Sequence, residues 1–273
     1  MAIFGIIMEK VSKSQIKLVK SLQHKKFRDE LGLFVAEGEK CVSELTKAFE
    51  LVHLFREGEN ATRIEIEQMS GLKSPQGVIG VFKKSNSPKD GLTAKRSVSD
   101  NGLSAEGGLF LALDGVQDPG NLGTIIRTCD WFGVHDIVCS LDTADCYNPK
   151  VVQATMGALA RVRVHYLDLP KWLAKQQCPI YGTLLDGKDM YECLSAKRSN
   201  SETVCQRSGL SAKRSIIVMG NEGNGISQEV RKLVTLPIRI PSYPKNAETS
   251  ESLNVSIATA IVLAEFRRKD ISL

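Results

Sequence analysis

Short apolar runs alternate with helical patterns along the C-terminal two thirds of the chain. The runs LFLALD, DIVCS, RVRVHYL, PIYGTLL, SIIVMG and TLPIRI are long enough for buried strands, and the helices between and after them are expected to begin near residues 121, 149, 171, 227 and 252. Apolar strands that alternate with helices are typical of a parallel sheet covered on both faces. The pattern therefore predicts a parallel α/β domain over residues 109–273.

The N-terminal part follows a smaller and different pattern. Residues 1–84 begin with a basic amphipathic helix, continue through a short strand and the turn at Gly38 into a second helix, and contain the candidate strands LVHLF and GVIGVF. The apolar positions expected to bury the first helix are Ile16, Val19, Leu22 and Phe27. These features predict a small mixed α/β unit that precedes the larger domain.

Polar, small-residue composition separates these two parts. Residues 85–108 are rich in Ser, Lys, Asn, Asp and Gly, which predicts a linker or an inserted loop. The string LTAKRS ends there at Ser97, and near copies, LSAKRS, end at Ser199 and Ser215, bracketing a second polar insertion over about 193–214. Three such short strings do not make a solenoid repeat. Surface decoration is the favoured interpretation, and a basic contribution to nucleic-acid binding is the alternative.

Charge permits an anionic partner without requiring one. The net charge is +5 and the isoelectric point is about 8.8, but seven Lys or Arg and no acidic residue fall between Lys10 and Arg28. Such a run forms either a solvated helix face or a surface that contacts phosphates. The sequence leaves both interpretations open.

Cysteine usage and hydropathy narrow the class of protein. The seven cysteines form no C-x-x-C pair and have no metal-ligand spacing with the four histidines, which favours reduced thiols in a cytoplasmic protein without a metal site. The apolar start MAIFGIIM lacks a basic leader, and no segment reaches the roughly 20 apolar residues of a membrane helix. We therefore expect no association with a membrane.

Three turns are the candidate sites of chemistry. DGVQDPGNLG and GNEGNG each follow an apolar strand, and the segment from Pro241 to Asn254 leads from the last strand into the final helix. Ligands of open parallel sheets bind beyond the carboxyl ends of strands, which is where these turns lie. No GxxxxGK[ST] loop, GxGxxG loop or GxSxG elbow is present. Glu222 would repel a pyrophosphate at a helix N-terminus, so a cationic or neutral ligand is favoured.

A small set of polar residues converges on this pocket: Asn121, Arg127, Glu222, Ser252 and Asn254. Ser252 is the expected N-cap of the final helix, whose docking face is expected to include Ile257, Ala260, Ile261, Ala264 and Glu265. These residues also have structural alternatives. Ser252 and Asn254 would then supply a helix cap and a satisfied buried amide, and Arg127 would form a surface or structural ion pair. The functional interpretation places the guanidinium against a phosphate or a developing alkoxide.

These turns resemble a known family. DPGNLGTIIRT, VMGNEGNGIS and IPSYPKNAETSESLNVSIA are similar to the three consecutive motifs of the SpoU (TrmH-like) branch of the SPOUT RNA 2'-O-ribose methyltransferases. Their order and spacing agree over about Leu109 to Lys269, apart from the insertion near 193–214. The segment KKFRDELGLFVAEGEKCVSEL resembles the RNA substrate-binding domain that precedes the catalytic domain in many members, a fold like that of some ribosomal proteins.

The resemblance implies a fold, a cofactor and site residues. It implies a SPOUT domain with a deep trefoil knot, a homodimer, and S-adenosylmethionine as cofactor without a metal. By motif position, the cofactor contacts are Gly220, Asn221, Gly223, Ile240 and Leu253, and the catalytic set is Asn121, Arg127, Glu222, Ser252 and Asn254.

The implied reaction is transfer of the sulfonium methyl group to a ribose 2'-hydroxyl in structured RNA, with 23S ribosomal RNA preferred to transfer RNA. Because arginine is effectively always protonated, Arg127 is expected to stabilise charge and hold a phosphate rather than act as the base. The alternatives are a non-catalytic RNA-binding or ribosome-assembly factor with the same fold, and a nucleotide-binding α/β enzyme, which the missing phosphate loop disfavours.

Overall fold

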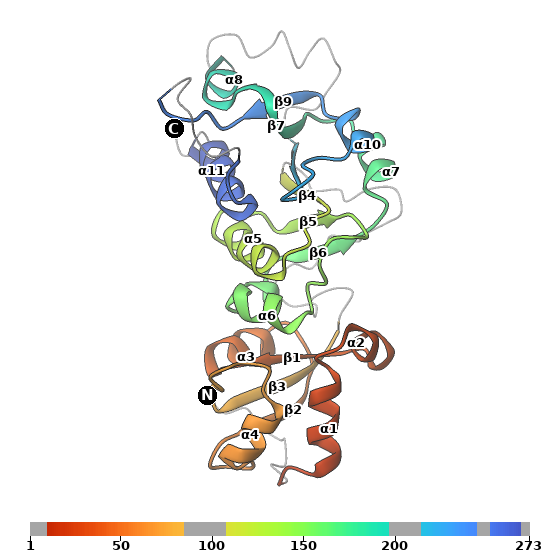
Figure 1. The fold of residues 1–273 in the computed structure, drawn as a ribbon, viewed down its shortest axis with the longest axis vertical. Coiled ribbons are helices and arrows are strands. Elements are labelled where there is room, and N and C mark those ends of the chain that lie inside the picture. Colours follow the sequence, from red (N-terminus) through yellow and green to blue (C-terminus); the bar gives the residue numbers. More distant parts are fainter. Residues whose placement is uncertain (1–9, 85–107, 197–213, 245–251, 269–273) are drawn as a thin grey trace. The chain divides into compact units, whose positions relative to one another are not determined.

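A computed structural model describes residues 10–84, 108–196, 214–244 and 252–268 (Figure 1). Most of the predicted linker and of the insertion near 193–214, including most of the KRS-ending strings, lies outside these residues. Among the helices described, none is both long and apolar enough to cross a membrane.

The chain forms two compact units that do not follow its sequence order. One unit comprises Met1–Lys89 together with Asp145–Arg161, and the other comprises Asp90–Ala144 and Val162–Leu273. The prediction from sequence keeps residues 145–161 within the larger domain, whereas the structure groups them with the N-terminal unit.

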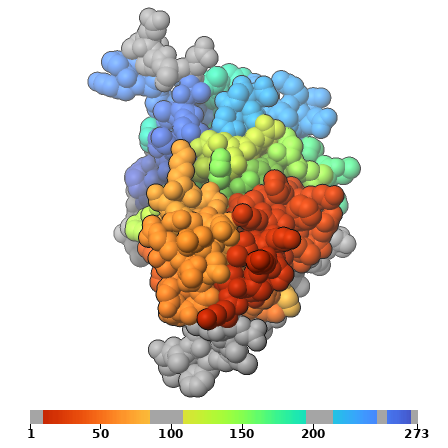
Figure 2. All heavy atoms as spheres, turned by 60° about the horizontal axis from the view of Figure 1, so that its bottom comes forward, coloured from red at the N-terminus to blue at the C-terminus, as the bar shows by residue number. Residues whose placement is uncertain are grey.

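The first unit is the small mixed α/β unit expected. Its antiparallel sheet has the order β1-β3-β2, with β1 at Leu33–Glu37, β2 at Leu51–Arg56 and β3 at Val78–Lys83. The helices are α1 (Lys13–Ser21), α2 (Lys25–Leu31), α3 (Glu39–Thr46) and α4 (Arg63–Met69). Helices α1 and α4 contact one another and share a core with the sheet, and their segments lie at the surface in Figure 2.

The predicted first helix is two helices. A capping box between Ser12 and Gln15 begins α1, which ends at Ser21, and α2 begins after the extended residue His24. Val19 and Leu22 are fully buried as expected, but Phe27 on α2 is 38% exposed. The chain changes direction between α1 and α2, so Phe27 does not lie on the buried face that a single continuous helix would have given it. Helix α4 was not expected, although its own capping box, between Thr62 and Glu65, is visible in the sequence.

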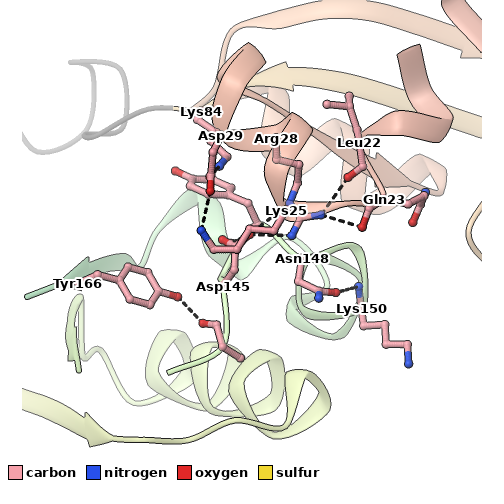
Figure 3. Close-up of polar contacts among 12 residues, drawn as sticks. Leu22, Gln23, Lys25, Arg28, Asp29, Lys84, Asp145, Asn148, Lys150 and Tyr166 are labelled. Atoms are coloured by element: carbon pink, nitrogen blue, oxygen red, sulfur yellow. Dashed lines mark hydrogen bonds and ion pairs between the residues drawn. The ribbon is translucent and has the colours of Figure 1, made fainter. Parts of the chain in front are cut away.

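A buried ion pair holds the segment Asp145–Arg161 within the first unit (Figure 3). The Arg28 side chain is 2% exposed, and its Nε and Nη2 lie 3.1 and 2.8 Å from Oδ2 of Asp145. Its Nη1 donates to the carbonyl oxygens of Leu22 and Gln23, each at 2.9 Å. The other oxygen of Asp145 accepts from the Tyr147 backbone N–H at 3.0 Å. The buried charges are therefore paired and hydrogen-bonded on both sides.

Further contacts secure this segment, which contains α6 (Pro149–Thr155) and the 3-10 helix η1 (Ala158–Ala160). The ring of Tyr147 lies 4.8 Å from that of Phe34 on β1, measured between centroids. Gly157 has a φ of +88°, and a β-carbon there would lie 2.5 Å from Cβ of Glu44 on α3. Only glycine allows this approach, so the backbone itself is fitted to the first unit.

The second unit confirms the predicted parallel α/β class. Six parallel strands have the order β6-β5-β4-β8-β7-β9. The strands are β4 (Leu109–Asp114), β5 (Asp136–Cys139), β6 (Arg163–Tyr166), β7 (Ile180–Asp189), β8 (Ser215–Gly220) and β9 (Leu236–Arg239), and the helices are α5 (Pro119–Trp131), α7 (Leu169–Ala174), α8 (Met190–Ala196), α10 (Gln228–Arg231) and α11 (Val255–Arg268).

Helices cover both faces of this sheet. Helices α7 and α10 bury apolar residues against the face that carries Phe110, Ala112 and Val218. Helices α5 and α11 contact one another, on the other side of the sheet in Figure 1. The docking face of α11 differs from the one predicted, because Ile257 is 54% exposed and the buried positions include Val255, Thr259 and Val262. Apolar residues occur nearly all round this helix, so periodicity alone did not select the face that packs.

Candidate active site

The first two marked turns leave the same edge of the sheet. Strands β4 and β8 are parallel neighbours whose register pairs Asp114 with Gly220, the last residue of each strand. The turn before α5 and the GNEGNG turn therefore start side by side at the carboxyl edge.

Asn221 shapes the GNEGNG turn. Its backbone N–H and carbonyl pair with Gly225 at 2.9 and 3.0 Å, and its side-chain oxygen accepts from the N–H groups of Gly223 and Asn224. Its amide nitrogen donates to the carbonyl of Gly115 at 2.7 Å, which ties the turn to the end of β4. A β-carbon on Gly220 would lie 2.3 Å from the carbonyl carbon of Gly225, so a side chain cannot fit there. The turn is compact, and Glu222 at its tip is exposed.

Asp114 is a site residue that the sequence analysis missed. It is 8% exposed, and its Oδ2 accepts a hydrogen bond of 2.7 Å from the backbone N–H of Ser227, the N-cap of α10. This contact fixes the far end of the GNEGNG turn to β4. The sequence offered only one sign of this role, an acidic residue at the end of the apolar strand LFLALD.

One polar side chain from each of the three turns meets in a hydrogen-bonded row. Nδ2 of Asn121 donates to Oε1 of Glu222 at 3.0 Å, and Nδ2 of Asn254 donates to Oδ1 of Asn121 at 3.0 Å. Asp118, the N-cap of α5, accepts from the backbone N–H of Asn121 at 2.8 Å and so fixes its position. The predicted convergence of Asn121, Glu222 and Asn254 is therefore present in the structure.

Asn254, and not Ser252, begins the final helix. Its Oδ1 accepts from the backbone N–H groups of Ser256 at 2.9 Å and Ile257 at 3.4 Å, while its Nδ2 faces Asn121. The prediction of Ser252 as N-cap was wrong, because α11 starts three residues later, at Val255. Within the described part of the chain, the exposed Ser252 side chain has no hydrogen-bond partner.

Arg127 stands apart from this row. It is exposed on α5 and makes no hydrogen bond or ion pair with any residue that the structure describes. Six residues at about 100° each turn it roughly 120° away from Asn121 around the helix axis. The alternative of a structural ion pair therefore finds no partner in the described chain, and the guanidinium is free to meet an anion.

The remaining predicted residues differ in exposure. Gly220 and Asn221 are partly buried, Gly223 is exposed, Ile240 is half-buried after β9, and Leu253 is 48% exposed. Among the described residues, the only partner of the Glu222 carboxylate is the neutral amide of Asn121. A carboxylate without a cationic partner, next in sequence to the exposed glycine backbone of Gly223, suits a cationic ligand.

Two solved structures share this architecture over nearly the whole chain. An RNA methyltransferase of the TrmH family from Porphyromonas gingivalis, described as putative, is 34% identical, with a TM-score of 0.73 over 95% of this chain and 99% of its own. An AdoMet-bound rRNA methyltransferase from Sinorhizobium meliloti is 29% identical, with a TM-score of 0.75 over 97% of this chain and 98% of its own.

Curated relatives extend the similarity at the level of sequence. The 23S rRNA (guanosine(2553)-2'-O)-methyltransferase RlmP of Bacillus subtilis is 27% identical over 95% of this chain and 98% of its own length. The 23S rRNA (guanosine-2'-O-)-methyltransferase RlmB of Neisseria meningitidis is 32% identical, but the match spans 59% of this chain and 58% of that protein.

Two family profiles match consecutive parts of the chain. Residues 13–63 match the MRM3-like substrate binding domain, and residues 108–264 match the SpoU rRNA Methylase family. The second match covers more than half of the 273 residues and includes all three turns. The chain therefore belongs to the SpoU rRNA methylase family.

Proposed function

We propose that this protein is an S-adenosylmethionine-dependent methyltransferase that methylates a ribose 2'-hydroxyl in structured RNA, with 23S ribosomal RNA as the preferred class and transfer RNA as the alternative. The observation that carries the proposal is the row formed by Asn121, Glu222 and Asn254, because it assembles one polar residue from each motif of a methyltransferase family. The names of the similar proteins, which act on 23S rRNA at a 2'-O position, support the substrate class.

The residues at the carboxyl edge fit this cofactor. When bound, S-adenosylmethionine supplies a methyl group on a positively charged sulfur. Glu222 offers a carboxylate without a cationic partner in the described chain, and the exposed backbone around Gly223 can bind the polar groups of a ligand. We assign the cofactor contacts to the backbone of Gly220, Asn221 and Gly223 and to the side chains of Ile240 and Leu253.

The chain's own residues divide the remaining tasks. A ribose hydroxyl is a weak nucleophile, so the site must stabilise the charge that develops on its oxygen. We assign to Arg127 the role of the cation that holds the neighbouring phosphate and stabilises that oxygen, since a guanidinium does not release its proton near neutral pH. We assign to Asn121, Glu222, Ser252 and Asn254 the orientation of the ribose.

The proposal includes a domain organisation and an assembly. Residues 1–84 would bind the RNA substrate, residues 85–108 would link the domains, and residues 109–273 would form the catalytic domain with its insertion near 193–214. The trefoil knot, the homodimer and a cytoplasmic location follow from the family resemblance. Light scattering on the full chain tests the homodimer directly, and a monomeric mass would contradict it.

Two measurements test the activity. Calorimetry should show that the full chain binds S-adenosylmethionine, and a labelled methyl group should then appear in ribosomal RNA as a site resistant to alkaline cleavage. Mapping 2'-O-methyl groups in cellular RNA with and without the gene should identify the nucleotide. RNA binding without cofactor binding would instead support the non-catalytic RNA-binding factor.

A further inference from the structure

Helix α1 carries a row of exposed lysines on one face. Lys13, Lys17 and Lys20 are all exposed. At 100° per residue they fall within an arc of about 60°, and at 1.5 Å per residue they extend over about 10 Å. We call these three residues the lysine row. The row belongs to the acid-free run from Lys10 to Arg28, whose role the sequence alone leaves open.

No local acid neutralises the lysine row. Within the described chain, none of its three residues makes a hydrogen bond or an ion pair through its side chain. Four other cations of the same unit each have a carboxylate partner: Lys25 with Asp29, Lys47 with Glu44, Arg56 with Glu39 and Lys83 with Glu50. The positive charge of the row is therefore available to a partner outside the chain.

Helix stability does not explain two of these lysines. Lys13 lies in the first turn of α1, where a cation opposes the helix dipole. Lys17 repeats the charge four residues later, and like charges at that spacing repel. The capping box between Ser12 and Gln15 holds the first turn in spite of this. Lys20 lies in the last turn, where a cation favours the helix dipole, so only Lys13 and Lys17 are displayed at a cost to the helix.

The shape of the helix surface favours a nucleic acid over a membrane. A helix that lies on a bilayer inserts its apolar face into the lipid. Val19 on α1 and Leu22, which caps its C-terminus, are fully buried in the core of the unit, so that face cannot insert. A row of cations without a free apolar face matches the regularly spaced charges of a phosphate backbone.

We propose that the lysine row binds the phosphate backbone of the RNA substrate, outside the catalytic unit. This inference rests on the proposed function, since it takes RNA as the substrate. The three ammonium groups act as point charges, so they contribute affinity and orientation but do not read the bases.

The test compares two triple variants with the same change in charge. The row variant carries Lys13→Gln, Lys17→Gln and Lys20→Gln, and the control carries Lys47→Gln, Lys83→Gln and Lys171→Gln, whose lysines are exposed but ion-paired. Fluorescence anisotropy with a ribosomal RNA fragment is measured over a series of salt concentrations. The logarithm of the binding constant falls as the logarithm of the salt concentration rises, and each lost phosphate contact should make this dependence less steep by about 0.7–0.9.

For the row variant we expect the salt dependence to be less steep by about two. We also expect its RNA affinity at about 0.1 M salt to fall on the order of tenfold to a hundredfold, and its KM for RNA to rise. The kcat at saturating RNA and the affinity for S-adenosylmethionine should not change. A variant with Lys13→Arg, Lys17→Arg and Lys20→Arg should keep the wild-type affinity, which also checks the fold.

Several results would overturn the inference. The row variant could bind RNA like the control, the control could lose as much affinity as the row variant, or row-dependent binding could occur to phosphatidylserine vesicles with RNA affinity unchanged. Failure to bind S-adenosylmethionine would overturn the proposed function alone, provided that RNA binding still depends on the row.

Discussion

The side-chain amide of Asn254 donates a hydrogen bond of 3.0 Å to the side-chain oxygen of Asn121, although 133 residues separate the two in the chain. Asn121 uses its own amide to donate to Glu222. Its oxygen and nitrogen are thus both engaged, which fixes the orientation of the amide. This one side chain therefore links the start of α5 both to the GNEGNG turn and to the start of α11.

Replacing Asn121 by Asp should disrupt the site electrostatically. The substitution removes the donor to Glu222 and places a second carboxylate where Nδ2 now lies, 3.0 Å from Oε1. We expect kcat to fall on the order of a hundredfold, as for loss of one oriented polar group in an active site. Single-turnover methyl transfer measures this. The matched control is Thr124→Ala, at an exposed position on the same helix, whose kcat should stay within twofold of the wild type. Equal activity of the two variants would exclude a role for the hydrogen bond between Asn121 and Glu222.

Asn254 has two separable roles: its side-chain oxygen caps α11, and its side-chain amide donates to Asn121. Asn254→Ala should lower the free energy of unfolding by about 1 kcal/mol, because the cap of α11 is lost. Asn254→Ser keeps a capping oxygen but has no amide to donate to Asn121, so it should retain most of the stability and lose activity. Urea unfolding and methyl transfer measured on both variants separate these roles. Full activity of the Ser variant would show that the contact with Asn121 is dispensable.

Arg127 should matter for activity and not for stability. Since it has no partner in the described chain, Arg127→Lys and Arg127→Gln should leave the melting temperature within about 1 °C, as is usual for surface substitutions. The Lys variant keeps the charge but loses the forked donors, so kcat/KM for RNA should fall on the order of tenfold, and further for Gln. Wild-type activity of the Lys variant would contradict a bidentate grip on phosphate.

Arg28 and Asp145 should be strongly coupled in stability. Removing one partner leaves a buried charge unpaired, so Asp145→Leu or Arg28→Met should destabilise the protein by about 3–5 kcal/mol. The double variant, with Arg28→Met and Asp145→Leu, should recover a large part of this loss. Denaturant unfolding followed by circular dichroism measures the cycle. Lys171→Ala, which breaks an exposed pair with Asp168, is the control and should leave the unfolding midpoint nearly unchanged.

Asp136 should make stability depend on pH under acid conditions. Burial favours its neutral form, but hydrogen bonds from His165 and Arg163 outweigh this and lower its pKa from 3.8 to about 2. Because the pKa is lower in the folded state, the carboxylate stabilises the protein fully above about pH 4, and this contribution is lost as the pH falls toward 2. Unfolding free energies of the wild type and Asp136→Asn should converge over that window. Parallel pH profiles would contradict the assignment.

The parts of the fold that the sequence predicted are those fixed by local pattern. Strands such as β4 and β8 are buried on both faces, so they are continuous apolar runs, and the turns after them contain the glycines that the backbone requires. Asn121 and Glu222 were found because each stands in such a turn, and Asn254 was found because it stands at the start of the final helix. Ser252 and Asn254 are both good capping residues, so the local pattern alone does not decide between them. Asp114 was missed because an acid at a strand end has no local signature of its backbone partner 113 residues away.

The path of residues 145–161 affects how the protein can be divided. These residues lie in sequence between β5 and β6 but belong to the compact unit of the N-terminal sheet. Cutting the chain after residue 84 would leave a fragment of residues 1–84 without Asp145 and the aromatic ring of Tyr147, so the Arg28 guanidinium would lose its counter-ion. A chimaera that exchanges the N-terminal module with a relative must therefore transplant two stretches of chain, with extra junctions at 144/145 and 161/162.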